Sequence, residues 1–231
     1  MKIMKNNKEQ KIEAIIFDID GTLYQFDQGD ESHFSSSRFG KQIHQNCIGF
    51  FMNTLGLKED QALEKYTDYR ARYNDEVSLG VEKELGINRS EYFANTWDLD
   101  PSEFIQPNTL LIETLSSLPV KTGILSAAPC IWVNKVLNFL EIKHIFDPDI
   151  FTGDPDLRKP NPKVFEQFSK LWGMPAQSIL SIGDQEKTDI IPAKSIGMMT
   201  ARIGQNIKTE ADFIAPNAIE MITLLKQKGI I

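Results

Sequence analysis

The chain shows two different hydrophobic patterns. Residues 14–17 form a short, wholly apolar run rich in β-branched side chains, which is typical of a buried strand in a parallel sheet. Similar runs occupy residues 120–126, 179–183 and 199–203, and apolar residues three and four apart predict helices over residues 131–140, 162–172, 189–196 and 218–226. Strands and helices therefore alternate, which predicts an α/β domain with a parallel sheet.

The remaining segment, between residues 25 and 104, has a helical pattern throughout. Its apolar positions follow spacings of three and four, without the alternation of a strand. In residues 59–78, one face carries Ala62, Tyr66, Tyr69, Tyr73 and Val77. Because the sheet pattern stops after its first strand and resumes near residue 107, we expect an all-helical insertion. The expected division is an α/β core of residues 1–24 and 106–231 and a helical domain of residues 25–105.

Composition restricts the class of partner. The 231 residues include 32 acidic and 25 basic side chains, a net charge of -7, which argues against general affinity for nucleic acid or an anionic membrane. No segment approaches the roughly 20 apolar residues of a membrane span, and the polar first eleven residues lack a secretory apolar stretch. Cys47 and Cys130 cannot form a disulfide framework. We therefore expect a cytoplasmic protein.

The most informative segment directly follows the first expected strand. It reads Asp18-Ile19-Asp20-Gly21-Thr22-Leu23. A turn at Gly21 would let the two carboxylates converge on one site. An Asp-rich turn without chemistry is the alternative, although the full hexapeptide behind an apolar strand is much more specific than two aspartates alone.

Polar residues of particular types also follow the later strands. Ser126 ends the strand expected at residues 120–126, and Lys159 lies before Pro160 and a helix. Asp184 follows the strand ending at Gly183, and a second carboxylate, Asp189, comes five positions later. Taken singly, a serine at a strand end and a loop lysine in solvent are ordinary features.

In this order and spacing, the four segments resemble the motifs of the haloacid dehalogenase (HAD) superfamily. The resemblance implies a Rossmann-like parallel sheet, with the helical insertion as a cap over the active site. It also implies that Asp18 attacks phosphorus and becomes an aspartyl-phosphate, while Asp20 serves as general acid and then general base. The implied phosphate-binding groups are Ser126, Lys159 and the backbone N–H of Ala127.

The resemblance further implies a Mg²⁺ site made by Asp18, the backbone carbonyl of Asp20, Asp184 and Asp189. Geometry and electrostatics agree with a cation at this place. The carboxyl ends of parallel strands meet at one edge of the sheet, which brings these aspartates together. Each close pair of carboxylates there repels by ~4 kcal/mol at an effective dielectric near 20. Oxygen ligands of this kind favour a hard divalent cation such as Mg²⁺.

Two residues adjust this expectation. Many members of the superfamily have Asn after the second-motif Ser or Thr, whereas this chain has Ala127, so an amide contact to the phosphate or leaving group is lost. Dehalogenases of the superfamily lack the second aspartate of the first motif and work without metal. The presence of Asp20 therefore argues against dehalogenation.

The substrate expectation is a small-molecule phosphomonoester. The helical insertion looks most like that of the pyrimidine 5′-nucleotidase branch, and Tyr66, Tyr69 and Tyr73 could stack on a base of a nucleoside monophosphate. The same tyrosines could equally form the core of the insertion. A sugar-phosphate phosphatase or phosphomutase on the same fold, and a non-catalytic phosphate-binding regulator, remain as alternatives.

Overall fold

The computed structural model describes residues 11–26, 34–205 and 208–231. The first ten residues of the polar N-terminal segment lie outside these residues. The chain divides into two compact units. The first contains Met1–Gln25, Pro107–Ala127 and Leu140–Ile231, and the second contains Phe26–Gln106 and Ala128–Phe139.

The first unit is built on one parallel sheet, which confirms the predicted α/β fold. Its strands are β1 (Ala14–Phe17), β2 (Lys121–Leu125), β3 (Ile150–Phe151), β4 (Ile179–Gly183), β5 (Met199–Ile203) and β6 (Phe213–Ala215). They lie in the order β3-β2-β1-β4-β5-β6, so strands β2 and β3 are added on one side of β1 and the later strands on the other side. Such a switch point is where parallel α/β sheets place their ligands.

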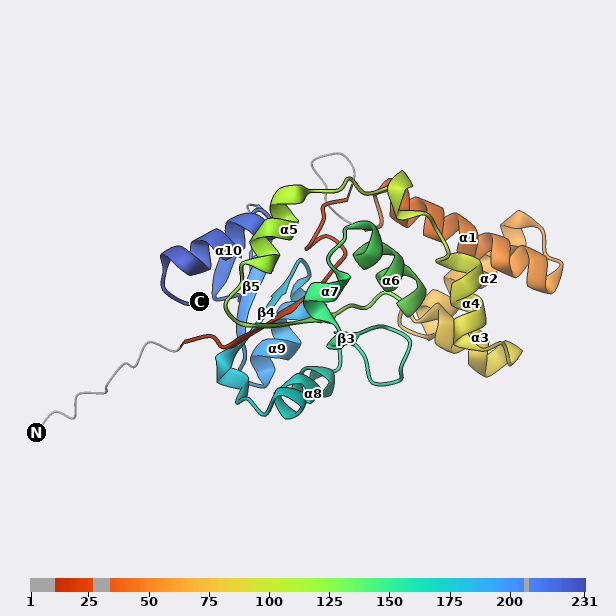
Figure 1. Ribbon diagram of the computed structural model, residues 1–231. Coiled ribbons are helices and arrows are strands. Elements are labelled where there is room, and N and C mark those ends of the chain that lie inside the picture. The colour runs from red at the N-terminus through yellow and green to blue at the C-terminus, as the bar shows by residue number, and fades with distance from the viewer. Residues whose placement is uncertain (1–10, 27–33, 206–207) are drawn as a thin grey trace, which may run out of the picture. The chain divides into compact units, whose positions relative to one another are not determined.

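Helices cover both faces of this sheet (Figure 1). They are α5 (Thr109–Ser116), α7 (Lys143–Phe146), α8 (Pro162–Trp172), α9 (Ile191–Ser195) and α10 (Ala218–Gln227), with η2 (Ala176–Ser178) and the π-helical η3 (Glu186–Ile190) as short turns. Helix α5 packs on α10, and α8 packs on α9. Ile16 of β1 lies in one core with Phe165 and Phe168 of α8. Successive strand residues point to opposite faces, and Phe17 accordingly contacts Phe146 of α7.

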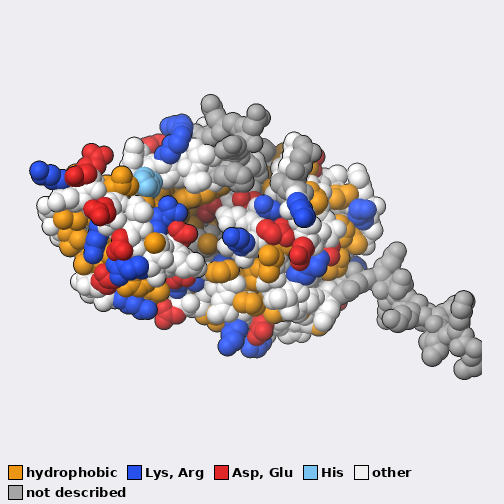
Figure 2. All heavy atoms as spheres, turned by 180° about the vertical axis from the view of Figure 1, so that it is seen from behind, with side chains coloured by type: hydrophobic (Ala, Val, Ile, Leu, Met, Phe, Trp, Pro, Cys, Tyr) orange, Lys and Arg blue, Asp and Glu red, His pale blue; other side chains and the backbone are white. Residues whose placement is uncertain are grey.

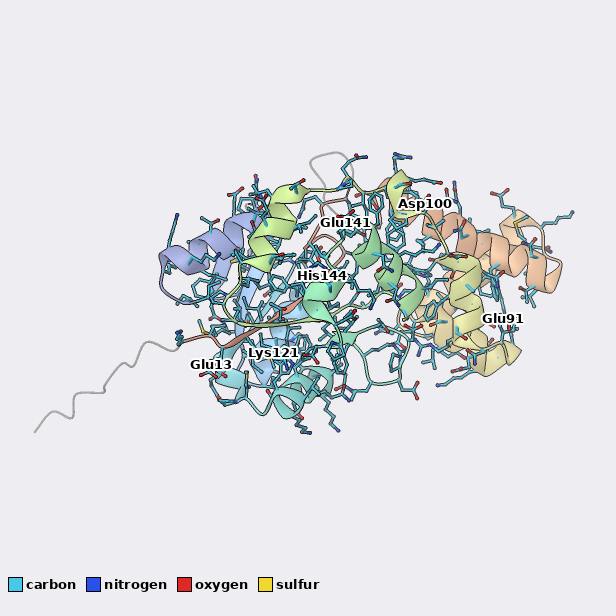
Figure 3. The ribbon with its side chains drawn as sticks, in the orientation of Figure 1. Glu13, Glu91, Asp100, Lys121, Glu141 and His144 are labelled. Carbon is cyan, nitrogen blue, oxygen red and sulfur yellow. The ribbon has the colours of Figure 1, made fainter. Side chains whose placement is uncertain are left out.

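The central strand β1 ends at about the same level as its two neighbours, β2 and β4. Phe17 of β1 lies opposite Ile124 of β2 and Ile182 of β4. The residues that follow these strands therefore leave the sheet at one edge. At the opposite edge, where β1 and β2 begin, the N–H of Lys121 donates to the carbonyl of Glu13, and Figure 3 labels both residues.

The second unit is helical. It contains α1 (Arg38–Leu55), α2 (Glu59–Arg72), α3 (Val77–Leu85), α4 (Arg89–Thr96), η1 (Pro101–Glu103) and α6 (Cys130–Phe139). Helix α6 belongs to this unit although it follows β2, because the ring of Trp132 stacks on Phe39 of α1 at 4.3 Å between centroids. Between β1 and β2, the named elements of the described residues are all helices, as the sequence pattern predicts.

Two local features depart from the sequence pattern. The periodic face over residues 59–78 is split between α2 and α3, because Asn74 and Asp75 take positive φ angles of 52° and 66°. Asn and Asp tolerate this left-handed region better than other non-glycine residues. The short strands β3 and β6 were not predicted, since two or three residues carry too little pattern to mark a strand.

Charge is spread over the surface. Acidic and basic side chains are interspersed on the face shown in Figure 2, so the net charge of -7 is not gathered into one continuous patch there. Among the described residues, no helix has both the length and the apolar composition needed to span a membrane.

Candidate active site

The turn after β1 presents the first carboxylate. Asp18 is anchored by its backbone, because its N–H donates to the carbonyl of Ile182 at 2.9 Å. Gly21 has a φ of 78°, which lets the chain fold back so that the N–H groups of Thr22 and Leu23 both donate to the carbonyl of Ile19. The hydroxyl of Thr22 donates to Oδ2 of Asp18 at 3.2 Å. The turn thus holds the Asp18 carboxylate at the end of the central strand.

A buried lysine joins this carboxylate to a second one. Lys159 Nζ lies 2.8 Å from Oδ1 of Asp18 and 2.5 Å from Oδ1 of Asp189. Only 6% of Lys159 and 1% of Asp189 are exposed. An ammonium held between two carboxylates offsets the charge of one of them, so the group retains net negative charge.

The loop after β4 positions Asp189 and Asp184. The second oxygen of Asp189 accepts the N–H of Gln185 at 2.9 Å. Gly183 is required here, because a Cβ at this position would lie 2.4 Å or less from the Asp189 side chain. Asp184 follows directly, and its Oδ1 is buried without a hydrogen-bond partner among the described residues.

The electrostatics of the cluster favour an additional cation. Burial raises the pKa of the Asp18 carboxyl to about 7, although the Lys159 ammonium opposes the shift. Burial, together with the charges of Asp18 and Asp189, raises the pKa of Asp184 to about 9. Burial works against the charge of Lys159, but the two carboxylates outweigh it and raise the pKa of the ammonium above its usual value.

The residues fit a hard divalent cation. One oxygen from each of Asp18, Asp184 and Asp189 lies within 4.8 Å of the other two. All three are carboxylates, the ligand type that Mg²⁺ prefers. The buried Oδ1 of Asp184, which lacks a partner among the described residues, is a polar atom that a cation would satisfy.

The remaining predicted site residues follow the ends of β1 and β2, which are neighbouring strands of the sheet. Ser126 is fully buried at the end of β2, where its N–H donates to the carbonyl of Phe151, whereas Ala127 is exposed. Asp20 is half-buried, and its Oδ1 accepts a hydrogen bond from the hydroxyl of Tyr24. Asp20 is absent from the group of carboxylates that could share a metal ion.

A family comparison agrees with this arrangement of carboxylates. A family model described as haloacid dehalogenase-like hydrolase matches residues 12–197, which include every residue of the cluster. The chain belongs to the haloacid dehalogenase-like (HAD) hydrolases.

Curated relatives within the HAD hydrolases carry phosphatase names. The chain is 26% identical to a glyceraldehyde 3-phosphate phosphatase of Methanopyrus kandleri, over 83% of this chain and 84% of the relative. It is 24% identical to a phosphoglycolate phosphatase of Shigella boydii, over 92% of this chain and 90% of the relative. The predicted likeness to the pyrimidine 5′-nucleotidase branch is not confirmed by these relatives.

A solved structure shows the same HAD fold. The crystal structure of a HAD phosphatase from Thermococcus onnurineus aligns with a TM-score of 0.63 at 22% identity, covering 93% of this chain and 98% of the other. At this level of identity, the likeness concerns the fold.

The helical unit of this HAD hydrolase does not offer the tyrosine surface that the sequence suggested. Tyr69 is fully buried and contacts Phe51, and Tyr66 is 9% exposed and contacts His44. Tyr73 is half-buried, and its hydroxyl donates to Glu84. The rings of Tyr66 and Tyr69 are therefore part of the core of the unit, which was the alternative weighed from the sequence.

Two contacts at the site were not anticipated from the sequence. The hydroxyls of Thr22 and Tyr24 donate to Asp18 and Asp20, respectively, each four positions away. The sequence does contain a signal, because in both pairs a hydroxyl residue follows an aspartate by four positions across the Gly21 turn. It was not recognised because a turn, unlike a helix, does not place residues four apart side by side by default.

Proposed function

We propose that this HAD hydrolase is a Mg²⁺-dependent phosphatase that cleaves small phosphomonoesters through an aspartyl-phosphate on Asp18. The observation that carries the proposal is the contact of Lys159 Nζ with Oδ1 of Asp18, beside the carboxylates of Asp184 and Asp189. Buried carboxylates around an ammonium would serve no purpose in packing, since apolar residues fill such space at lower cost.

In the first proposed step, an oxygen of Asp18 attacks phosphorus, and the bond between phosphorus and the ester oxygen breaks. Asp20 gives its proton to that oxygen, which leaves as an alcohol. Lys159 and the hydroxyl of Ser126 would hold the phosphoryl oxygens, together with the N–H of Ala127. The Thr22 hydroxyl keeps the Asp18 carboxylate oriented.

In the second proposed step, Asp20 takes a proton from water as the water oxygen attacks phosphorus. The bond between phosphorus and Asp18 breaks, and inorganic phosphate leaves with Asp18 restored. Asp18, Asp184 and the backbone carbonyl of Asp20 would hold Mg²⁺, with Asp189 in support. When bound, the cation supplies positive charge that lets the carboxylates and the phosphate dianion approach each other.

The proposed substrates are small phosphorylated carbohydrates and hydroxy acids. The support is the names of the relatives, glyceraldehyde 3-phosphate phosphatase and phosphoglycolate phosphatase. Nucleoside monophosphates were favoured from the sequence, but two of the tyrosines proposed to stack on a base, Tyr66 and Tyr69, are buried. Nucleoside monophosphates therefore serve as the comparison group in the substrate test.

The test is a panel of phosphomonoesters assayed with Mg²⁺ and after treatment with EDTA. The panel contains glyceraldehyde 3-phosphate, phosphoglycolate, glycerol 3-phosphate, glucose phosphates, UMP and CMP, and the measured quantity is kcat/KM for phosphate release. We expect a three-carbon or two-carbon phosphate to exceed both nucleotides by about tenfold, and activity to require Mg²⁺.

Each alternative predicts a different result. A phosphomutase would isomerise a glucose phosphate with little phosphate release, and a phosphate-binding regulator would turn over none of the esters. A nucleotidase would hydrolyse UMP or CMP best. Full activity after removal of metal with EDTA would contradict the metal-dependent mechanism.

A further inference from the structure

The turn after β1 contains a hydrogen bond between two side chains near the site. The hydroxyl of Tyr24 donates a hydrogen bond to Oδ1 of Asp20. The backbones of the same two residues form an isolated β-bridge. Tyr24 is 8% exposed, so its hydroxyl is held at the carboxylate by a ring that is itself fixed in place.

The turn is closed without this contact. Thr22 and Leu23 donate their N–H groups to the carbonyl of Ile19, and the Gln25 side-chain amide donates to the carbonyl of Gly21. These bonds account for the backbone path from one end of the turn to the other. The phenol hydroxyl acts at the Asp20 carboxylate, and hydrogen bonds to a charged acceptor are among the stronger ones.

We infer that Tyr24 is a positioning residue for Asp20, an inference that rests on the proposed function. The phenol occupies Oδ1 of Asp20, so the proton that Asp20 exchanges is carried on Oδ2. In the first step, the Oδ2–H bond breaks and the leaving oxygen gains that proton as its bond to phosphorus breaks. In the second step, water loses a proton to Oδ2 while its oxygen bonds to phosphorus. Tyr24 keeps its own proton throughout.

A fixed carboxyl group matters most when the leaving oxygen is a poor leaving group. An alkoxide requires a well-placed proton donor in order to depart, whereas p-nitrophenolate departs without one. The rate constant kcat/KM reports the steps up to the first irreversible one, here formation of the aspartyl-phosphate. A positioning role for Tyr24 should therefore depend on the leaving group.

The decisive variant is Tyr24→Phe, which keeps the ring and removes the hydroxyl. We expect kcat/KM for the best alkyl phosphomonoester of the panel to fall by about 10-fold or more, and that for p-nitrophenyl phosphate by less than about 3-fold. The matched control is Tyr92→Phe, which removes a buried hydroxyl that donates to Cys47 in the helical unit. It should leave the ratio of the two constants unchanged.

A double-variant cycle tests whether the effect passes through Asp20. In an Asp20→Asn background, Tyr24→Phe should lower kcat/KM for the alkyl ester by less than about 2-fold, because the acid that it positions is already absent. Thermal unfolding of each variant measures the fold independently. If Tyr24→Phe unfolds, Tyr24→His, which retains a ring N–H donor, replaces it and should retain more alkyl-ester activity than Tyr24→Leu.

The outcomes separate this inference from the proposed function. Equal losses for the two esters, no loss for either, or an undiminished effect in the Asp20→Asn background would overturn the role of Tyr24 alone. Wild-type protein that hydrolyses neither ester in the presence of Mg²⁺ would overturn the proposed function, and this inference with it.

Discussion

Lys159 Nζ lies 2.8 Å from Oδ1 of Asp18, although 141 positions separate the two residues in the sequence. The same nitrogen contacts Asp189, so one ammonium serves two buried carboxylates. In the proposed mechanism, Asp18 is the nucleophile, and Lys159 has both a structural role and a role in the reaction. It reduces repulsion within the free protein and would hold a phosphoryl oxygen during the reaction.

The first prediction concerns this lysine. Lys159→Met should lower the free energy of unfolding of the metal-free protein by about 3 kcal/mol, because two buried carboxylates lose their counterion. Urea unfolding in EDTA measures the loss. Adding Asp189→Asn to the same protein should recover at least half of it. Lys170→Met, at a lysine whose side chain is 79% exposed, is the control and should change stability by less than about 0.5 kcal/mol.

The second prediction separates stability from metal binding. Asp184→Asn should stabilise the metal-free protein at neutral pH by about 1 kcal/mol, because the raised pKa of Asp184 means that burial of this carboxyl costs free energy that a neutral amide avoids. The rise in melting temperature on adding Mg²⁺, expected for the wild type, should be largely lost in the variant. A variant that is less stable than wild type in EDTA, yet gains as much from Mg²⁺, would contradict the assignment of a metal site here.

The third prediction uses a glycine. Gly183→Ala should destabilise the protein by about 1 to 3 kcal/mol and reduce turnover, because the added Cβ would lie within 2.4 Å of Asp189 and displace its carboxylate. Gly49→Ala is the matched control, since a Cβ there meets nothing within 4 Å. In the interior of helix α1, it should be neutral or stabilising by up to about 1 kcal/mol. Equal behaviour of the two variants in unfolding and activity assays would refute the steric argument.

The sheet could be predicted from the sequence where a strand has four or five mostly apolar residues. The run at residues 179–183 is β4, and that at residues 199–203 is β5. Strands β3 and β6 have two and three residues, respectively, and depend on pairing with their neighbours. No local sequence pattern therefore predicts them. The helix expected at residues 189–196 instead begins with a π-helical turn, which residue spacing alone does not reveal.

The candidate site could be located but not detailed. Aspartates that directly follow buried strands had to meet at one edge of the sheet, and Asp18 and Asp184 do so. The contact of Tyr24 with Asp20 depends on how tightly the Gly21 turn folds back, which the sequence does not specify. Burial of Tyr66 and Tyr69 likewise depends on which helices pack against α2, so an aromatic stripe could not distinguish core from binding surface.

The most direct test of the account is to trap the phosphorylated enzyme. Wild-type protein mixed with a phosphate-labelled ester and quenched in acid within milliseconds should carry the label on Asp18, as located by peptide mass spectrometry. Asp18→Asn should carry none, and its turnover should fall by roughly three orders of magnitude or more, while Asp60→Asn, at an exposed residue of α2, should match wild type. Label on a different residue, or turnover that survives in Asp18→Asn, would contradict the central claim.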